Sequence, residues 1–190
     1  MALIVLSGPS GVGKNTIINE VLKKIPEIKS SRSLTTRKAR PNDVPRKYTH
    51  VDKKEFQEHI KNGDLLEWAE YNDNLYGTLK PDLNENSLFE IEVKGAAQIK
   101  ALYPEAHLLL ILPPGNTIEE KINVLRERLQ KRAVDENETI EKRLAEAKEE
   151  ISQGTQQSEK IFINDNLDMA IAEIVESIQS LLQKEGARRK

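Results

Sequence analysis

A glycine-rich segment near the N-terminus carries the clearest chemical signal in this sequence. Gly8, Gly13 and Lys14 stand in the spacing G-x-x-x-x-G-K. Glycine lets the backbone turn tightly, so that successive N–H groups point at one anion, while a lysine here reaches the outer phosphates of a nucleotide. The competing account is a glycine-rich turn with a solvated lysine. The pattern predicts a phosphate loop that binds ATP through Gly8, Pro9, Ser10, Gly11, Val12, Gly13, Lys14, Asn15 and Thr16.

The residue after Lys14 departs from the usual motif. Ser or Thr is expected there, because its hydroxyl binds magnesium, but the chain has Asn15 followed by Thr16. An amide oxygen is a hard ligand of different reach. Asn15 is therefore a candidate ligand for Mg²⁺ arriving with ATP, and we expect magnesium binding to be weakened or rearranged.

A second segment places two arginine guanidinium groups beside hydroxyl side chains. Arg37 and Arg40 lie three residues apart, and Pro41 and Pro45 keep the segment from being helical. Guanidinium groups suit a phosphate monoester because they donate two parallel hydrogen bonds. A basic turn taken alone is as often a solvated surface. The phosphate loop upstream favours the first interpretation, an acceptor that itself carries phosphate.

The elements that must position these residues follow from hydrophobic periodicity. Strands are predicted at 2–7, 87–93, 107–112 and 161–164, and helices from Lys14 and at 95–102, 117–131, 139–152 and 171–181, before a frayed polar tail, 184–190. Strands alternating with helices indicate an α/β fold with a parallel sheet covered on both faces. Residues 31–80 instead predict a small inserted lobe of short antiparallel strands around a helix at 53–61.

Composition narrows the class of protein. With 190 residues we expect one compact unit. The absence of cysteine excludes a disulfide framework, and His50, His59 and His107 are too scattered for a zinc site. A net charge of -2 argues against nucleic-acid binding driven by counterion release. The apolar run 2–7 is too short to span a membrane, so we expect a cytoplasmic protein. We also expect a monomer or homodimer.

Several motifs together resemble the guanylate kinase family over nearly the whole chain. They are GPSGVGK, SLTTRKARP, LLEWAEYNDNLYGT, ILPP, EKRLAEAKEEI and IFINDNLD. The resemblance implies an ATP:GMP phosphotransferase that uses Mg²⁺, with small-molecule nucleotides as its partners. It also implies a single domain with a P-loop core (1–31, 81–117 and 146–190), a GMP-binding lobe (32–80) and a helical lid (118–145).

The resemblance also assigns roles in the acceptor site. It implies that the GMP phosphate is held by Ser33, Arg37, Arg40, Tyr48 and Tyr76, and that Glu67 and Thr78 contact the guanine edge. A carboxylate accepts from guanine N1–H and the exocyclic amine, which adenine cannot offer, so a buried Glu67 discriminates against AMP. The alternatives are a surface carboxylate beside Trp68 and tyrosines that only pack.

On the donor side, the resemblance matches Arg128, Arg132 and Arg143 to arginines that close on the triphosphate. Mobile arginines neutralise charge on the transferring group, although single helical arginines are more often solvated or ion-paired. Together with Lys14 and Arg37 they form the predicted catalytic set. Asn164 and Asp165 match the segment near the adenine, where a plain turn is the alternative.

The match fails at the strand before the second core helix. The family places two aspartates and Gln-Gly there, whereas this chain has Glu90, Glu92, Lys94 and Gly95. Alternation puts Glu90 and Glu92 on one strand face, about 6.5–7 Å apart. We predict a paired acidic site for guanine, magnesium or an arginine, in which both residues are candidates for binding GMP and Glu90 is also a candidate magnesium ligand.

Two other functions remain open from the sequence. A guanylate-kinase-like binding module would keep the nucleotide cleft without turnover, and a P-loop kinase would act on another phosphorylated acceptor. The full cationic set argues against the first, and competition by GMP but not AMP would count against the second. Since a misplacement of about 1 Å costs on the order of 100-fold in rate, the departures also allow for an impaired kinase.

Overall fold

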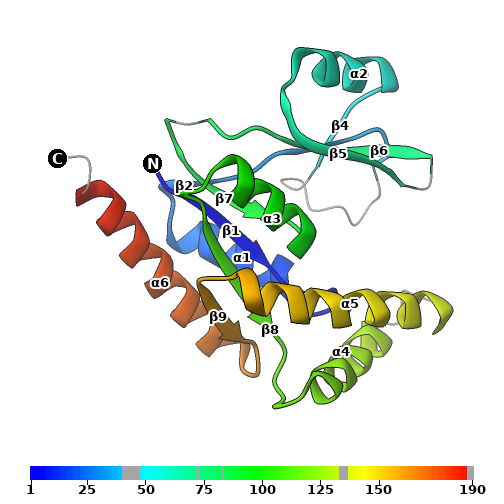
Figure 1. The fold of residues 1–190 in the computed structure, drawn as a ribbon, viewed down its shortest axis with the longest axis vertical. Coiled ribbons are helices and arrows are strands. Elements are labelled where there is room, and N and C mark those ends of the chain that lie inside the picture. Colours follow the sequence, from blue (N-terminus) through cyan, green and yellow to red (C-terminus); the bar gives the residue numbers. More distant parts are fainter. Residues whose placement is uncertain (40–47, 72, 83, 133–136, 188–190) are drawn as a thin grey trace.

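The computed structural model describes residues 1–39, 48–71, 73–82, 84–132 and 137–187. Helices and strands alternate along much of the chain (Figure 1). In chain order they are β1 (Leu3–Ser7), α1 (Lys14–Lys24), β2 (Ile28–Ser30), β3 (Ser33–Thr35), β4 (Tyr48–His50), α2 (Lys53–Asn62), β5 (Leu65–Tyr71), β6 (Asn74–Leu79), β7 (Asn86–Glu90), α3 (Val93–Leu102), β8 (His107–Leu112), α4 (Ile118–Arg132), α5 (Asn137–Gln157), β9 (Lys160–Ile163) and α6 (Leu167–Ala187).

The larger sheet is parallel and has the strand order β2-β7-β1-β8-β9. Its central strand β1 is buried along its whole length, and alternate residues pack into different clusters. Ile4 and Leu6 face α1 and α6, whereas Leu3 and Val5 join the cluster that contains residues of α3. The prediction of a parallel sheet with helices on both faces is confirmed.

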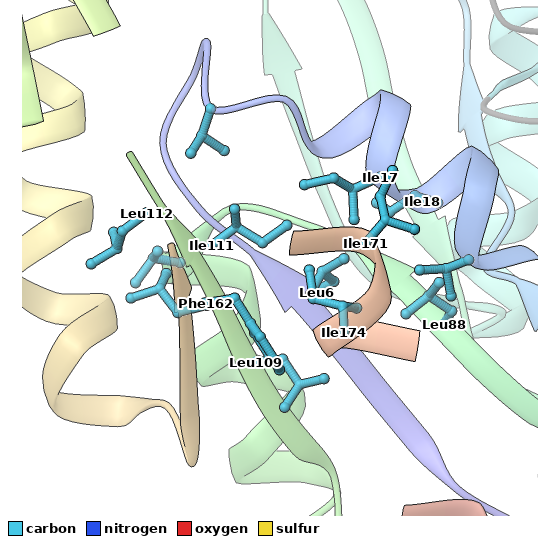
Figure 2. Close-up of a cluster of buried hydrophobic side chains, with 14 of the residues drawn as sticks. Leu6, Ile17, Ile18, Leu88, Leu109, Ile111, Leu112, Phe162, Ile171 and Ile174 are labelled. Carbon is cyan, nitrogen blue, oxygen red and sulfur yellow. The ribbon is translucent and has the colours of Figure 1, made fainter. Parts of the chain in front are cut away.

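The packing around β1 fixes where the following loop begins. Figure 2 shows Leu6 beside Ile17 and Ile18 of α1 and beside Ile171 and Ile174 of α6, with all five side chains buried. Burying one such side chain contributes about 1.5–3 kcal/mol. Strand and helix are therefore held on either side of residues 8–13. Because the strands are parallel, the loops after β1, β7, β8 and β9 all leave from one edge of the sheet.

The inserted lobe forms a second sheet of four strands in the order β4-β3-β6-β5, and α2 packs on it (Figure 1). Phe56 of α2 is buried against Leu34 and Leu65. The lobe was predicted, but the strand directions only in part. β3 pairs with β6 and β5 with β6 in the antiparallel sense, whereas β3 and β4 are parallel. The long connection 36–47 permits this, since parallel neighbours need a crossover.

Several expectations about boundaries were wrong. Strand β7 ends at Glu90, because β1, its partner, turns away soon after the pair Leu6↔Glu90. α3 then begins at Val93, and Glu92 is its extended N-cap residue. α6 continues through the polar stretch to Ala187 instead of fraying from 184. Strand β2 was not predicted, because Ile28 is its only buried residue.

None of the helices in the described part of the chain is long and apolar enough to cross a membrane.

Candidate active site

The phosphate loop connects β1 to α1, as its spacing predicts. Gly8, Gly11 and Gly13 have φ values of 150°, 87° and 102°, which side-chain-bearing residues rarely adopt. At Gly8 there is also no room, since a Cβ atom would lie 2.3 Å from the Ile111 carbonyl oxygen. Gly13 precedes α1 and has no side chain to cap the helix. The positive helix terminus is therefore presented where an anion would sit.

Lys14 folds back over this loop. Its ammonium group donates hydrogen bonds to the carbonyl of Gly8 and, at 3.2 Å, to that of Pro9. The side chain is half-buried. A cation held above backbone N–H groups and beside a helix N-terminus makes an anion site for more than one negative charge.

The two predicted magnesium ligands lie on elements next to this loop. Asn15 is exposed in the first turn of α1, and Glu90 ends β7, which is the strand beside β1. Magnesium is usually bound through one or two protein oxygens together with phosphates and water. An amide and a carboxylate oxygen fit that donor set. Within the described ranges, no group of three or more acidic, histidine or cysteine side chains forms a metal site by itself.

The residues predicted to bind the acceptor are brought together by strand register in the second sheet. Tyr48 pairs with Ser33, Ser33 with Thr78, and Thr78 with Glu67, so these four residues form one row across β4, β3, β6 and β5. Residues directly opposite each other in a sheet share a face. Tyr76, two residues before Thr78, lies on the same face. The opposite face packs against α2 through Leu34.

Glu67 and Thr78 interact directly within this row. The Thr78 hydroxyl donates a 2.6 Å hydrogen bond to Glu67 Oε1. Thr78 is buried, and Glu67 is partly buried. The bond limits the rotamers of the carboxylate and holds it on the sheet surface. A fixed acceptor of this kind is suited to recognising paired N–H donors such as those of guanine.

The cationic and aromatic residues lie at one end of the row. The Arg37 guanidinium carbon is 5.7 Å from the centre of the Tyr48 ring, and the Tyr48 and Tyr76 rings meet edge to face at 6.1 Å. Arg37 also donates to the Lys38 carbonyl at 2.8 Å. Arg40 lies outside the described residues. Arg37, Tyr48 and Tyr76 thus form one cluster suited to a phosphate group.

Helix α4, which the resemblance assigns to a lid, packs directly on the phosphate loop. A Cβ atom at Gly11 would lie 3.2 Å from Leu129 Cγ. Arg128 Nη2 donates to the Asn164 carbonyl at 2.7 Å, and Nη1 lies 3.5 Å from that of Val12. Arg143 is half-buried on α5, which is joined to α4 by an ion pair between Arg126 and Glu141. Arg132 ends α4, and its side chain is outside the described part.

Asn164 and Asp165 follow β9 at the same edge of the sheet. Asn164 is 6% exposed, and its side-chain amide donates to the Val12 carbonyl at 2.7 Å. Asp165 is exposed. The predicted adenine segment therefore adjoins the phosphate loop.

Glu150 was missed by the sequence reasoning. It lies on α5 and accepts a hydrogen bond from the backbone N–H of Val93. Burial raises its pKa to about 7; nearby Lys14 opposes the rise, and Glu92 and Glu146 add to it. The spacing of Arg143, Glu146 and Glu150 puts all three on one flank of α5 beside its buried stripe. This helical spacing was the feature of the sequence that could have identified Glu150 as a candidate.

The sequence model of the guanylate kinase family matches residues 1–181. The chain is 43% identical over 190 residues to a guanylate kinase of Gloeobacter violaceus, covering 96% of this chain and 87% of that protein. The chain belongs to the guanylate kinase family. A second guanylate kinase, from Synechocystis, is 42% identical over 93% of this chain and 92% of its own length.

The guanylate kinase fold is supported by a solved structure. The crystal structure of guanylate kinase from Anaplasma phagocytophilum aligns with a TM-score of 0.69 and 27% identity, over 94% of this chain and 85% of that one. The chain therefore belongs to a family of nucleoside monophosphate kinases, and its clustered residues fall into two groups. One group borders the phosphate loop and the other covers a face of the second sheet.

Proposed function

We propose that this chain transfers the terminal phosphoryl group of ATP to GMP, giving ADP and GDP. The observation that carries the proposal is the phosphate loop between β1 and α1, with Lys14 above it, in a chain of the guanylate kinase family. In this proposal Lys14 and the N–H groups of the loop hold the donor phosphates. We assign the whole chain to a single domain with three parts. These are a core (1–31, 81–117 and 146–190), a GMP-binding lobe (32–80) and a lid (118–145).

The acceptor binds across the row on the second sheet. Glu67, held by Thr78, accepts from guanine N1–H and the exocyclic amine, while Ser33, Arg37, Arg40, Tyr48 and Tyr76 hold the phosphate. Adenine offers no N1–H donor, so AMP would leave the fixed carboxylate unpaired, which costs binding free energy. Glu90 and Glu92, at the β7–α3 junction, complete the acceptor set in this proposal.

The reaction needs alignment and charge neutralisation more than proton transfer. The bond from the terminal phosphorus of ATP to its bridging oxygen breaks, and a phosphate oxygen of GMP bonds to that phosphorus. No protein base is required, since the acceptor is already an oxyanion at neutral pH. Arg128, Arg132 and Arg143 neutralise charge when the lid closes.

Asn15 and Glu90 would hold Mg²⁺ that enters with ATP. Bound there, the ion supplies charge neutralisation of the phosphate oxygens. We also propose a cytoplasmic monomer or homodimer whose ligands are ATP and GMP and which binds neither nucleic acid nor membrane.

A coupled assay with Mg-ATP and each of GMP, dGMP, AMP, CMP and UMP tests the function. GDP should form from GMP, and Lys14→Ala should reduce the rate at least about 100-fold, because the loop loses its cation. Lys23→Ala is the matched control, since Lys23 is exposed on the same helix and, in the contacts described, pairs only with half-exposed Glu20 at 2.7 Å. If the wild type makes no GDP at any GMP concentration, the proposal is wrong. Calorimetry showing GMP binding without turnover would then favour a binding module.

A further inference from the structure

Asn164 occupies the junction of three separate parts of the chain. Its backbone N–H donates to the Leu112 carbonyl at the end of β8 at 2.8 Å, and its carbonyl accepts from Arg128 of α4 at 2.7 Å. Its side-chain amide donates to the Val12 carbonyl in the phosphate loop at 2.7 Å. Two of these bonds hold the Asn164 backbone and the third holds its buried side chain, so the residue has little freedom to turn.

The bond to Val12 determines the orientation of one peptide group in the loop. The Val12 carbonyl and the Gly13 N–H belong to the same planar trans peptide and therefore point in opposite directions. A donor that holds the carbonyl on the side of Asn164 turns the Gly13 N–H away from Asn164. Arg128 Nη1, 3.5 Å from the same oxygen, is a second, longer contact on that side.

The space around Gly13 strengthens this constraint. A Cβ atom on Gly13 would lie 2.7 Å from Asn164 Nδ2, so the amide is packed against the bare backbone of the loop. Gly13 also has φ 102° and precedes the first residue of α1. Glycine has the softest backbone of all residues, and its peptide would rotate easily without an external support. Asn164, which is far from the loop in sequence, provides that support.

We propose that Asn164 is a positioning residue for the donor nucleotide: by holding the Val12 carbonyl, it aims the Gly13 N–H at the phosphates bound in the loop. The inference rests on the proposed function, because it assumes that ATP is the ligand of this loop. It assigns the Asn164 side chain a role in the geometry of the loop and not in contacting the base.

Two variants separate this role from simple packing. Asn164→Ala removes the donor, and Asn164→Asp keeps the shape but places a carboxylate oxygen against the carbonyl oxygen. We expect KM for ATP to rise on the order of 10- to 100-fold in both, because a misaligned Gly13 N–H no longer donates to the bound phosphates. KM for GMP should stay within about 2-fold, because the acceptor row lies in the other sheet. KM does not depend on the fraction of enzyme that folds, so a less stable variant still gives an answer.

Asn166→Ala is the matched control from the same loop. Asn166 Oδ1 accepts from the Met169 N–H at 3.1 Å and caps α6, so its loss should lower Tm and leave KM for ATP unchanged. The inference is overturned if either Asn164 variant keeps KM for ATP within about 2-fold of wild type, or if KM for GMP rises in parallel. If wild type makes no GDP, the proposed function fails, and calorimetric titration of the same variants with Mg-ATP still tests the inference by the same fold-change in Kd.

Discussion

Glu150 allows the charge arrangement beside the phosphate loop to be measured through folding stability. Burial raises the pKa of its carboxyl from the usual 4.5 to about 7; Lys14 limits the rise, and Glu92 and Glu146 add to it. The raised value means that the folded protein binds a proton more tightly than the unfolded chain does. The resulting stability is fully present below pH 4.5 and is lost as the pH rises through about 7.

The size of the effect follows from that difference in pKa. At about 1.4 kcal/mol for each pH unit, a rise from 4.5 to about 7 corresponds to about 3 kcal/mol between pH 4 and pH 9. Solvent around the partly exposed carboxyl screens this to about 2 kcal/mol. Glu150→Gln removes the charge and keeps an oxygen that can accept from the Val93 N–H. We therefore expect the variant to match wild type at pH 4 and to be about 2 kcal/mol more stable at pH 9.

Urea unfolding at several pH values between 4 and 9 measures this directly, and about 2 kcal/mol corresponds to a Tm difference of about 4–8 °C in a chain of this size. Glu149→Gln is the control, because Glu149 is exposed on the same helix and pairs with Lys94 only at 4.0 Å. If the stability difference between Glu150→Gln and wild type is the same at pH 5 and pH 9, the reasoning about burial is refuted.

Two further substitutions test the acceptor row and the loop. Glu67→Gln puts an amide donor where guanine also donates. We therefore expect kcat/KM for GMP to fall on the order of 100-fold, while the weak activity with AMP changes little. An equal fall for both nucleotides would contradict this. Gly8→Ala places a Cβ atom 2.3 Å from the Ile111 oxygen and should abolish Mg-ATP binding measured by calorimetry. Gly186→Ala, with no atom within 4 Å of the new Cβ, is the control and should bind normally.

The phosphate loop and the parallel sheet were predictable because their signals are local. An apolar strand, a glycine spacing and a helical period lie next to one another in residues 2–25, and each is visible within a short window. The acceptor row is different. Nothing in the spacing of residues 33, 48, 67 and 78 states that they lie side by side; only the register of four strands does so. The family resemblance supplied those residues, and the structure supplies their common face.

The local signals also had limits at element boundaries. Strand β2 has one buried residue out of three, so it has no periodic pattern to recognise. The polar end of α6 was predicted to fray from 184, yet the helix continues to Ala187, and within this stretch Glu185 Oε1 lies 3.9 Å from His107 Nε2 of β8. In both cases packing partners from elsewhere in the chain decide the conformation, and propensity does not.

The prediction that Glu90 and Glu92 share one strand face was wrong, and the edge of the parallel sheet shows why. Glu90 and Glu92 would share a face only if the strand continued, but β1 gives β7 no partner beyond Glu90, and Glu92 moves to the N-terminus of α3. There the helix dipole favours its negative charge. A second carboxylate, Glu150, reaches the same N-terminus from α5 through the Val93 N–H. The acidic pair beside Lys14 is therefore built from two helices. Its spacing depends on how α5 packs on α3, so a substitution that shifts α5 relative to α3 would alter the charge around Lys14.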